Sequence, residues 1–140
     1  MQLPAKTQNA CLAALELARR HRNPQPVCLK TIAEEHEISS QFLVQILLQL
    51  KRAGIVRSTR GSSGGYRLAA DPQDISLLQI IEAMEGSSAD RPAATDNPIA
   101  RVFFDSWTSV AEEQRNRLAE LTLEKLCSSI ESQETDMYYI

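Results

Sequence analysis

Residues 38–68 read ISSQFLVQILLQLKRAGIVRSTRGSSGGYRL, and this stretch decides the fold of the chain. Its opening serines can cap a helix, because a side-chain hydroxyl accepts a hydrogen bond from a free backbone N–H of the first turn. Apolar residues then recur on one side of that helix, at Phe42, Leu43, Ile46, Leu47 and Leu50. Gly54 suits the position just after the helix end. The pattern predicts a half-buried helix followed by a turn.

A second short helix is expected over residues 30–36, with Ile32 and Ala33 facing inward. Two short helices joined by a tight turn form a helix-turn-helix, whose second helix enters the major groove of DNA. Hydroxyl, amide and cationic side chains at its exposed positions would bind phosphates and base edges. The candidate DNA-binding residues here are Lys30, Ser39, Ser40, Gln41, Gln45 and Lys51, with the two glutamines at base edges. Val44 would either touch a thymine methyl group or be partly buried, and partial burial is favoured.

A β-hairpin is expected next, from the β-favouring run at residues 55–59 and its return at residues 66–68. Glycines and serines at the tip have little bulk, so the backbone can approach a phosphate closely. We expect Arg60 to reach a minor groove and Ser62 and Ser63 to contact the DNA backbone, as the wing of a winged helix. An ordinary surface loop is the alternative. A nucleotide-binding loop is excluded, because the GK[ST] sequence and the strand-to-helix context are missing.

Outward from this stretch, the predicted fold class is mainly α with a small β-hairpin wing. Helices are expected over residues 5–21, after Ser76, and from Pro98 to about residue 130, with an extended entry at 26–29. The predicted organisation is a winged helix-turn-helix DNA-binding domain at 1–86, a linker at 87–97, and a dimerisation helix with a fraying acidic tail at 98–140.

The last helix is too long for one small domain to cover its apolar side, which predicts a homodimer. The expected dimerisation residues are Ile99, Phe103, Trp107, Val110, Leu118 and Leu121. A two-fold dimer presents two recognition helices, so a roughly palindromic DNA site is expected.

Charge is distributed unevenly along the 140 residues, whose net charge is -3. Residues 1–70 hold ten Lys or Arg against four Glu, a balance of +6, and residues 71–140 carry -9. This asymmetry favours a polyanionic partner for the first half. Neither a membrane span nor a signal peptide is present, which predicts a cytoplasmic protein. No catalytic constellation is recognisable, so an enzyme is not expected.

The chain has three cysteines, Cys11, Cys28 and Cys127, too far apart in sequence for a zinc knuckle. We interpret each as a small buried residue, with a thiol switch as the alternative. His21 and His36 have no partner at metal-ligand spacing and are expected to be solvated or helix-end residues. No metal site is predicted.

The runs LKRAGIV, RGSSGGYRLA and DPQDISLLQII resemble the Rrf-type family of transcriptional regulators, with its IscR-, NsrR- and CymR-like members, over roughly residues 5–86. The resemblance implies a dimeric winged helix-turn-helix that binds promoter DNA, usually as a repressor. Many members ligate an iron-sulfur cluster through three cysteines before the long helix. Residues 86–98 contain no cysteine, so no cluster is expected. Val44 also stands where the family motif commonly has Glu.

Two hypotheses follow from these observations. The first is a sequence-specific repressor without a cluster, which binds double-stranded DNA as a homodimer. The second is a winged-helix protein-interaction module that regulates a partner enzyme or polymerase subunit. The positive half of the chain favours DNA, and Leu48 on the otherwise polar helix face favours a protein partner. The effector is open between a small molecule, a partner protein and cysteine oxidation.

Overall fold

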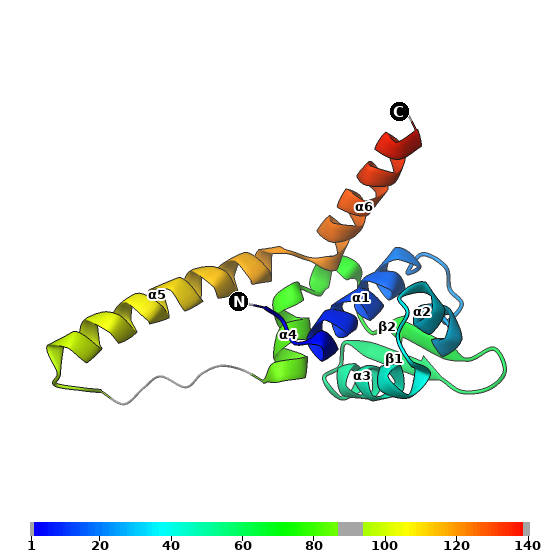
Figure 1. The fold of residues 1–140 in the computed structure, drawn as a ribbon. Coiled ribbons are helices and arrows are strands. Elements are labelled where there is room, and N and C mark those ends of the chain that lie inside the picture. Colours follow the sequence, from blue (N-terminus) through cyan, green and yellow to red (C-terminus); the bar gives the residue numbers. More distant parts are fainter. Residues whose placement is uncertain (1, 87–93, 139–140) are drawn as a thin grey trace.

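The computed structural model describes residues 2–86 and 94–138 (Figure 1). Within these ranges the chain forms α-helices, one short 3-10 helix and one β-hairpin. The elements in order are α1 (Ala5–Arg19), α2 (Leu29–Glu35), α3 (Ser40–Arg52), β1 (Val56–Thr59), β2 (Gly65–Leu68), η1 (Pro72–Asp74), α4 (Leu77–Glu85), α5 (Pro98–Glu120) and α6 (Leu123–Tyr138). The prediction of a mainly α fold with a small β-hairpin is confirmed.

The hydrophobic core lies where α1, α3 and α4 pack against one another beneath the hairpin. Alanines along α1 allow close approach of its neighbours, since Ala10, Ala13 and Ala14 have no exposed surface. The helix-turn-helix contributes Ile32 from α2 and the inner face of α3 to the same core. Both elements of the motif are therefore held in place by a shared apolar base.

The ends of the predicted helices are close to the observed ones, because their capping residues act as expected. Ser39 precedes α3, and its hydroxyl accepts a hydrogen bond from the Phe42 backbone N–H at 3.3 Å. Gly54 follows the end of α3 with φ +78°, a left-handed conformation that glycine adopts without strain. Ser76 and Gln79 form a reciprocal capping box at the start of α4.

The wing is a two-stranded antiparallel hairpin in which Val56 pairs with Leu68 and Thr59 pairs with Gly65. The extended entry expected at residues 26–29 is reduced to one antiparallel bridge between Val27 and Tyr66. A Cβ atom at Gly65 would overlap the Val27 carbonyl, so this bridge requires a glycine there. The base of the hairpin is thereby tied to the loop before α2.

The expected single helix from Pro98 to about residue 130 is wrong, because the chain breaks it between α5 and α6. The break pairs with the segment before α4: the Leu77 N–H donates to the Leu121 carbonyl and the Leu123 N–H donates to the Ile75 carbonyl, both at 2.9 Å. Leu123 is thereby fully buried in the core. Thr122 accepts a hydrogen bond from the Lys125 N–H and starts the second helix.

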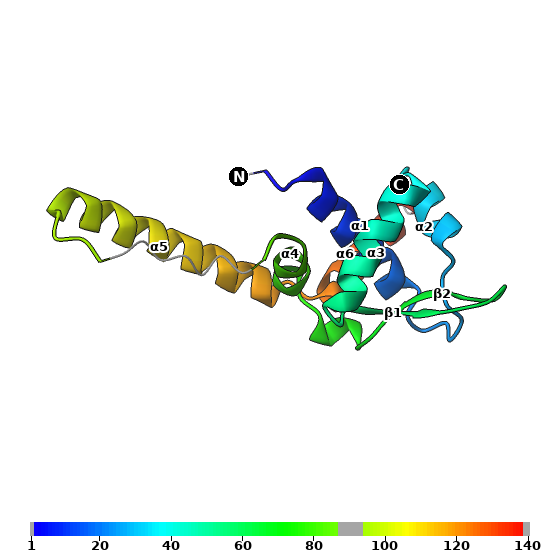
Figure 2. The ribbon, with the colours of Figure 1, turned by 90° about the horizontal axis from the view of Figure 1, so that it is seen from below.

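The tail that was expected to fray is helical to Tyr138, the last residue that the structure describes. It lies beside α1, where Arg19 and Glu134 form an ion pair at 2.8 Å. The α5 helix instead projects away from the body of the molecule, opposite the hairpin tip (Figure 2). None of the described helices is both long and apolar enough to cross a bilayer.

Candidate nucleic-acid interface

The α3 helix has one buried and one exposed face. Leu43, Ile46 and Leu47 have no exposed surface, which fixes the rotation of the helix about its axis. Gln41 and Gln45, one turn apart, are consequently exposed on the opposite side. Their amide groups have the donor and acceptor pattern that binds an adenine edge in the major groove. The structure thus presents both predicted base-reading residues together on one surface.

The phosphate-binding residues predicted before α3 surround its N-terminus. Ser39 and Ser40 are exposed there, with Ser39 also serving as the helix cap. Lys30 lies on α2, where its ammonium is 3.8 Å from Glu34 and its side chain remains 83% exposed. Exposed pairs of this kind hold a lysine weakly, so a phosphate can compete for it.

Two apolar residues share the outward face of α3 with the glutamines. Val44 and Leu48 are each 38% exposed, so Val44 is partly buried, as favoured from the sequence, and still presents part of its surface outward. Neither neighbours the core on the inner face of the helix. Both are therefore available to touch thymine methyl groups, the apolar feature of the major groove.

The wing extends the basic surface beyond α3. Arg60, Ser62 and Ser63 are exposed at its tip, as predicted. The Lys51 ammonium donates to the Ser58 hydroxyl at 2.7 Å, which joins α3 to β1 and leaves two ammonium protons for phosphate. Arg57 on β1 is also exposed. Sequence reasoning missed Arg57, although its alternation with the buried Val56 was the available clue.

An apolar stripe on α5 is the second exposed surface of note. Ile99 is 81% exposed, Phe103 58%, Trp107 54% and Val110 58%, and all four fall on one side of the helix. Leu118 and Leu121 are half-buried within their own chain, near the break after α5. The first four predicted dimerisation residues are thus open to a partner, and the last two are partly covered.

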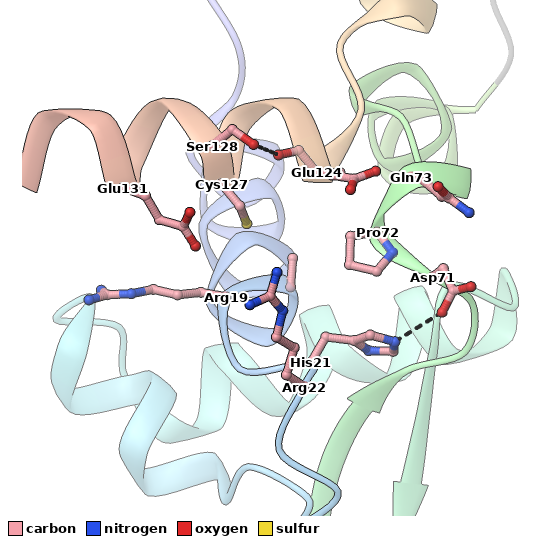
Figure 3. Close-up of a pocket in the computed structure, with 11 residues that line it drawn as sticks. Arg19, His21, Arg22, Asp71, Pro72, Gln73, Glu124, Cys127, Ser128 and Glu131 are labelled. Carbon is pink, nitrogen blue, oxygen red and sulfur yellow. Dashed lines mark hydrogen bonds and ion pairs between the residues drawn. The ribbon is translucent and has the colours of Figure 1, made fainter.

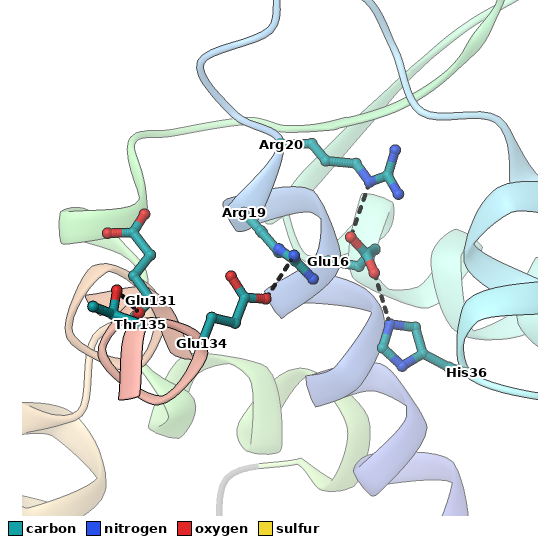
Figure 4. A network of polar contacts seen from close by, with 7 residues as sticks. All are labelled: Glu16, Arg19, Arg20, His36, Glu131, Glu134 and Thr135. Atoms are coloured by element: carbon teal, nitrogen blue, oxygen red, sulfur yellow. Dashed lines mark hydrogen bonds and ion pairs between the residues drawn. The ribbon is translucent and has the colours of Figure 1, made fainter. Parts of the chain in front are cut away.

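A buried carboxylate links α1 to the helix-turn-helix (Figure 4). The side chain of Glu16 is 4% exposed and lies 2.9 Å from Arg20 Nε and 3.2 Å from His36 Nε2. His36 ends α2, just before the turn. His21 similarly pairs with Asp71 at 3.2 Å. Both histidines lie at helix ends as expected, but each contacts a carboxylate, so the alternative of a solvated side chain is wrong.

We expect Glu16→Gln to destabilise the protein by about 1–3 kcal/mol at neutral pH, the usual cost of breaking a buried polar pair. Burial raises the pKa of Glu16, but the hydrogen bonds and charges of Arg20 and His36 outweigh burial and leave this pKa below its ordinary 4.5. The stabilisation is therefore present above pH 4.5 and is lost as the pH falls through the lower folded-state pKa. Urea unfolding at neutral and acidic pH measures this change.

The matched control for this measurement is Glu134→Gln, which removes a carboxylate from the half-exposed pair with Arg19. An exposed pair contributes about 0–1 kcal/mol, so this variant should unfold nearly as the parent does. An equal loss of stability in Glu16→Gln at neutral and strongly acidic pH would contradict the role assigned to the buried carboxylate.

The donor residues present do not fit a cysteine-ligated iron–sulfur cluster. Cys11 lies on α1, Cys28 precedes α2 and Cys127 lies on α6, so no two of them share an element. Across the ranges that the structure describes, no three His, Cys, Asp or Glu side chains gather as metal ligands. Burial, with help from Glu85, raises the pKa of Cys11 to about 11, which keeps this thiol protonated.

Cys28 was interpreted as a small buried residue, but it is exposed. Its Sγ lies 3.0 Å from the Thr31 hydroxyl. Hydrogen bonds from Thr31 lower the pKa of the Cys28 thiol below its ordinary value. Cys11 and Cys127 are half-buried, closer to that expectation.

Comparison with known proteins gives consistent matches over almost the whole chain. The Rrf2 family, described as "Iron-dependent Transcriptional regulator", matches residues 3–129. The HTH-type transcriptional regulator CymR of Bacillus subtilis (strain 168) is 32% identical over 141 aligned positions, which cover 100% of both chains. These relatives are regulators of transcription, a class without enzymatic activity.

Solved structures agree with the sequence matches. The structure of CymR, the global cysteine regulator of B. subtilis, has a TM-score of 0.81 at 30% identity, covering 92% of this chain and 98% of that chain. The structure of T. potens IscR also has a TM-score of 0.81, at 31% identity, covering 95% of this chain and 90% of that chain. The winged-helix architecture is therefore shared along nearly the full length.

Proposed function

Because this chain belongs to the Rrf2 family of DNA-binding transcriptional regulators, we propose that it is a cytoplasmic homodimeric repressor of a palindromic promoter site. One observation carries the proposal: the exposed face of α3 presents Gln41 and Gln45 beside a basic wing, on a helix whose rotation the core fixes. Base readout requires such a fixed orientation, because hydrogen bonds to base edges tolerate little displacement.

The contacts divide into two groups with different consequences. Gln41 and Gln45 read bases, with Val44 and Leu48 available for thymine methyl groups. Lys30, Ser39, Ser40 and Lys51 bind phosphates around the same helix. Arg60, Ser62 and Ser63 extend the contact to the next groove. Backbone contacts contribute most of the salt-dependent affinity, and base contacts contribute the discrimination.

The second copy of the chain is proposed to cover the apolar stripe of α5. Four large side chains at Ile99, Phe103, Trp107 and Val110 are more than half exposed on one helix side. A soluble protein seldom leaves such a continuous stripe in water. Packing two α5 helices together buries it, and two-fold symmetry places two α3 helices for the two halves of a palindrome.

Repression and the lack of a cluster complete the proposal. A dimer bound across a promoter blocks polymerase by occupancy alone, so repression needs no further surface. The sequence between α4 and α5 supplies no thiolate for an iron–sulfur cluster, and the three cysteines lie on separate elements. DNA binding by this chain is therefore proposed not to depend on iron.

The test is selection of genomic fragments by the purified protein, purified under iron-free conditions. Recovery of a palindromic motif at a promoter, with lower transcription from that promoter when the protein is present, is the expected result. Recovery of random fragments, or a need for added iron and sulfide, would overturn the proposal. A motif recovered together with raised transcription would overturn repression alone.

Gln45→Ala is expected to relax discrimination at one base pair by about 1–3 kcal/mol, because it removes a bidentate base contact. Arg60→Ala should instead lower affinity for all sequences and reduce the salt dependence of binding by about one counterion. Fluorescence anisotropy with the selected site, single-base variants of it and a salt series measures both effects.

Gln133→Ala on α6 is the matched control for Gln45→Ala, since it removes an exposed amide distant from the helix-turn-helix. It should bind as the parent does. If Gln45→Ala keeps the parent's preference at every base pair, the assignment of Gln45 to base readout is wrong.

A further inference from the structure

A pocket of about 450 Å³ lies between α1, η1 and α6, and no residue of α3, β1 or β2 lines it (Figure 3). Its walls come from three separated parts of the chain. Arg22 follows α1, Asp71 precedes η1, and Glu124, Cys127 and Glu131 lie on one side of α6. The volume falls in the range of small-molecule sites in proteins, about 300–1,000 Å³.

Charges of opposite sign face each other across this pocket. The Arg22 guanidinium and the Glu131 carboxylate both point into the space between α1 and α6 (Figure 3). No hydrogen bond or ion pair to the side chain of Arg22, Glu124 or Glu131 occurs in the described part of the chain. Within the described residues, the Arg22 guanidinium and the carboxylates of Glu124 and Glu131 are therefore available to bind charged groups of a ligand.

The walls are held in place without a ligand. Arg67 of β2 donates to the carbonyls of His21 and Pro24 at 3.0 and 3.1 Å, which fixes the loop that carries Arg22. On the other side, α6 is held by the fully buried Leu123, whose backbone N–H donates to the Ile75 carbonyl. A site whose groups are already positioned loses little conformational entropy on binding.

Of the other lining residues, Arg19 is paired with Glu134 and Asp71 with His21, and the rest carry no charge. Burial, with the nearby carboxylate of Glu131, raises the pKa of the Cys127 thiol above its ordinary 9.0, so the thiol is protonated at neutral pH. Ala18 and Pro72 complete this part of the lining. The pocket therefore combines the cationic Arg22, the carboxylates of Glu124 and Glu131, and a small neutral surface.

We propose that this pocket binds a free α-amino acid, with its carboxylate on Arg22 and its ammonium group on Glu131. Glu124, two helical turns from Glu131 on α6, adds negative potential to the same wall. An arginine binds a carboxylate through two parallel hydrogen bonds, and a carboxylate binds an ammonium group through a charge-assisted hydrogen bond. A ligand of one sign satisfies only one wall and is repelled by the other. The zwitterion satisfies both, and its side chain faces Cys127 and Ala18.

The proposal is tested by calorimetric titration of the full chain with free α-amino acids at neutral pH. At least one is expected to bind saturably below millimolar concentration. Its N-acetyl and carboxamide derivatives, each lacking one charge, should bind at least about tenfold more weakly, which corresponds to about 1.4 kcal/mol. Equal binding of the derivatives, or no binding by any amino acid, would overturn the proposal.

Substitutions of lining residues test whether the amino acid binds in this pocket. Arg22→Gln and Glu131→Gln should each weaken binding at least about tenfold, by the same loss of one charged contact. Both side chains are exposed and form no ion pair with the residues that the structure describes, so the variants should keep the parent's melting temperature. Arg117→Gln on α5, an exposed arginine beside Glu120, is the matched control and should bind normally. Unchanged binding in both pocket variants would sink the assignment.

The outcome is independent of DNA recognition. The same preparations are assayed for binding to the selected promoter site without amino acid. If the parent binds DNA but no amino acid, only the proposed amino-acid site is refuted. If the parent binds an amino acid but no DNA, only the proposed function is refuted.

Discussion

Replacing Phe103 and Trp107 together by glutamate is expected to convert the proposed dimer to a monomer and to lower affinity for the proposed promoter site by about 100-fold or more. Both residues are more than half exposed on the α5 stripe. Burying two carboxylates in an apolar interface is unfavourable by several kcal/mol. A monomer engages one half-site at a time and loses the effective concentration that links the two, worth about 100-fold or more.

Light scattering coupled to size-exclusion chromatography gives the mass, and anisotropy gives the affinity. Asp105→Ala is the matched control, because Asp105 is exposed on the same helix but away from the stripe. It should remain dimeric and bind DNA normally. A double-glutamate variant that stays dimeric at micromolar concentration would show that α5 is not the proposed interface.

Leu47→Ala is expected to destabilise the protein by about 2–5 kcal/mol, the range for a fully buried leucine replaced by alanine. Leu47 lies on the inner face of α3 and has no exposed surface. A small domain has only about 5–15 kcal/mol of stability in total, so this loss is a large fraction of it. Urea unfolding followed by circular dichroism measures the change.

The neighbouring Leu48→Ala provides the control within the same helix. Leu48 is 38% exposed on the outward face, so its truncation removes few core contacts and should change stability by about 0.5 kcal/mol or less. Similar losses in the two variants would mean that α3 is rotated about its axis relative to the structure, and the assignment of Gln41 and Gln45 to base readout would then be wrong.

The local features of the fold were predictable because they depend on neighbouring residues. Ser39 and Ser76 cap helices wherever the chain around them is helical, and Gly54 ends a helix for a reason that operates within one turn. The helical periodicity of apolar residues in α3 likewise identified its inner face, except at Phe42, which is 37% exposed. These rules need no knowledge of the rest of the structure.

The break between α5 and α6 depends on a long-range contact and was not predictable in the same way. No Gly or Pro interrupts Leu121, Thr122 and Leu123, and the helix ends because the backbone there pairs with residues 75–77. Thr122 followed by Glu124 was a weak local indication of a new helix start. The Glu16 network and the pocket beside α6 also join distant segments, so neither could be read from spacing alone.

The joint at Leu121–Leu123 makes α5 a lever. Its 23 residues span about 34 Å at 1.5 Å per residue, and its base is fastened to the segment before α4. A tilt of about ten degrees at that base moves the far tip by about 6 Å, nearly two base-pair steps of 3.4 Å. In the proposed dimer, the angle at this three-residue joint therefore sets the distance along the duplex between the two α3 recognition helices.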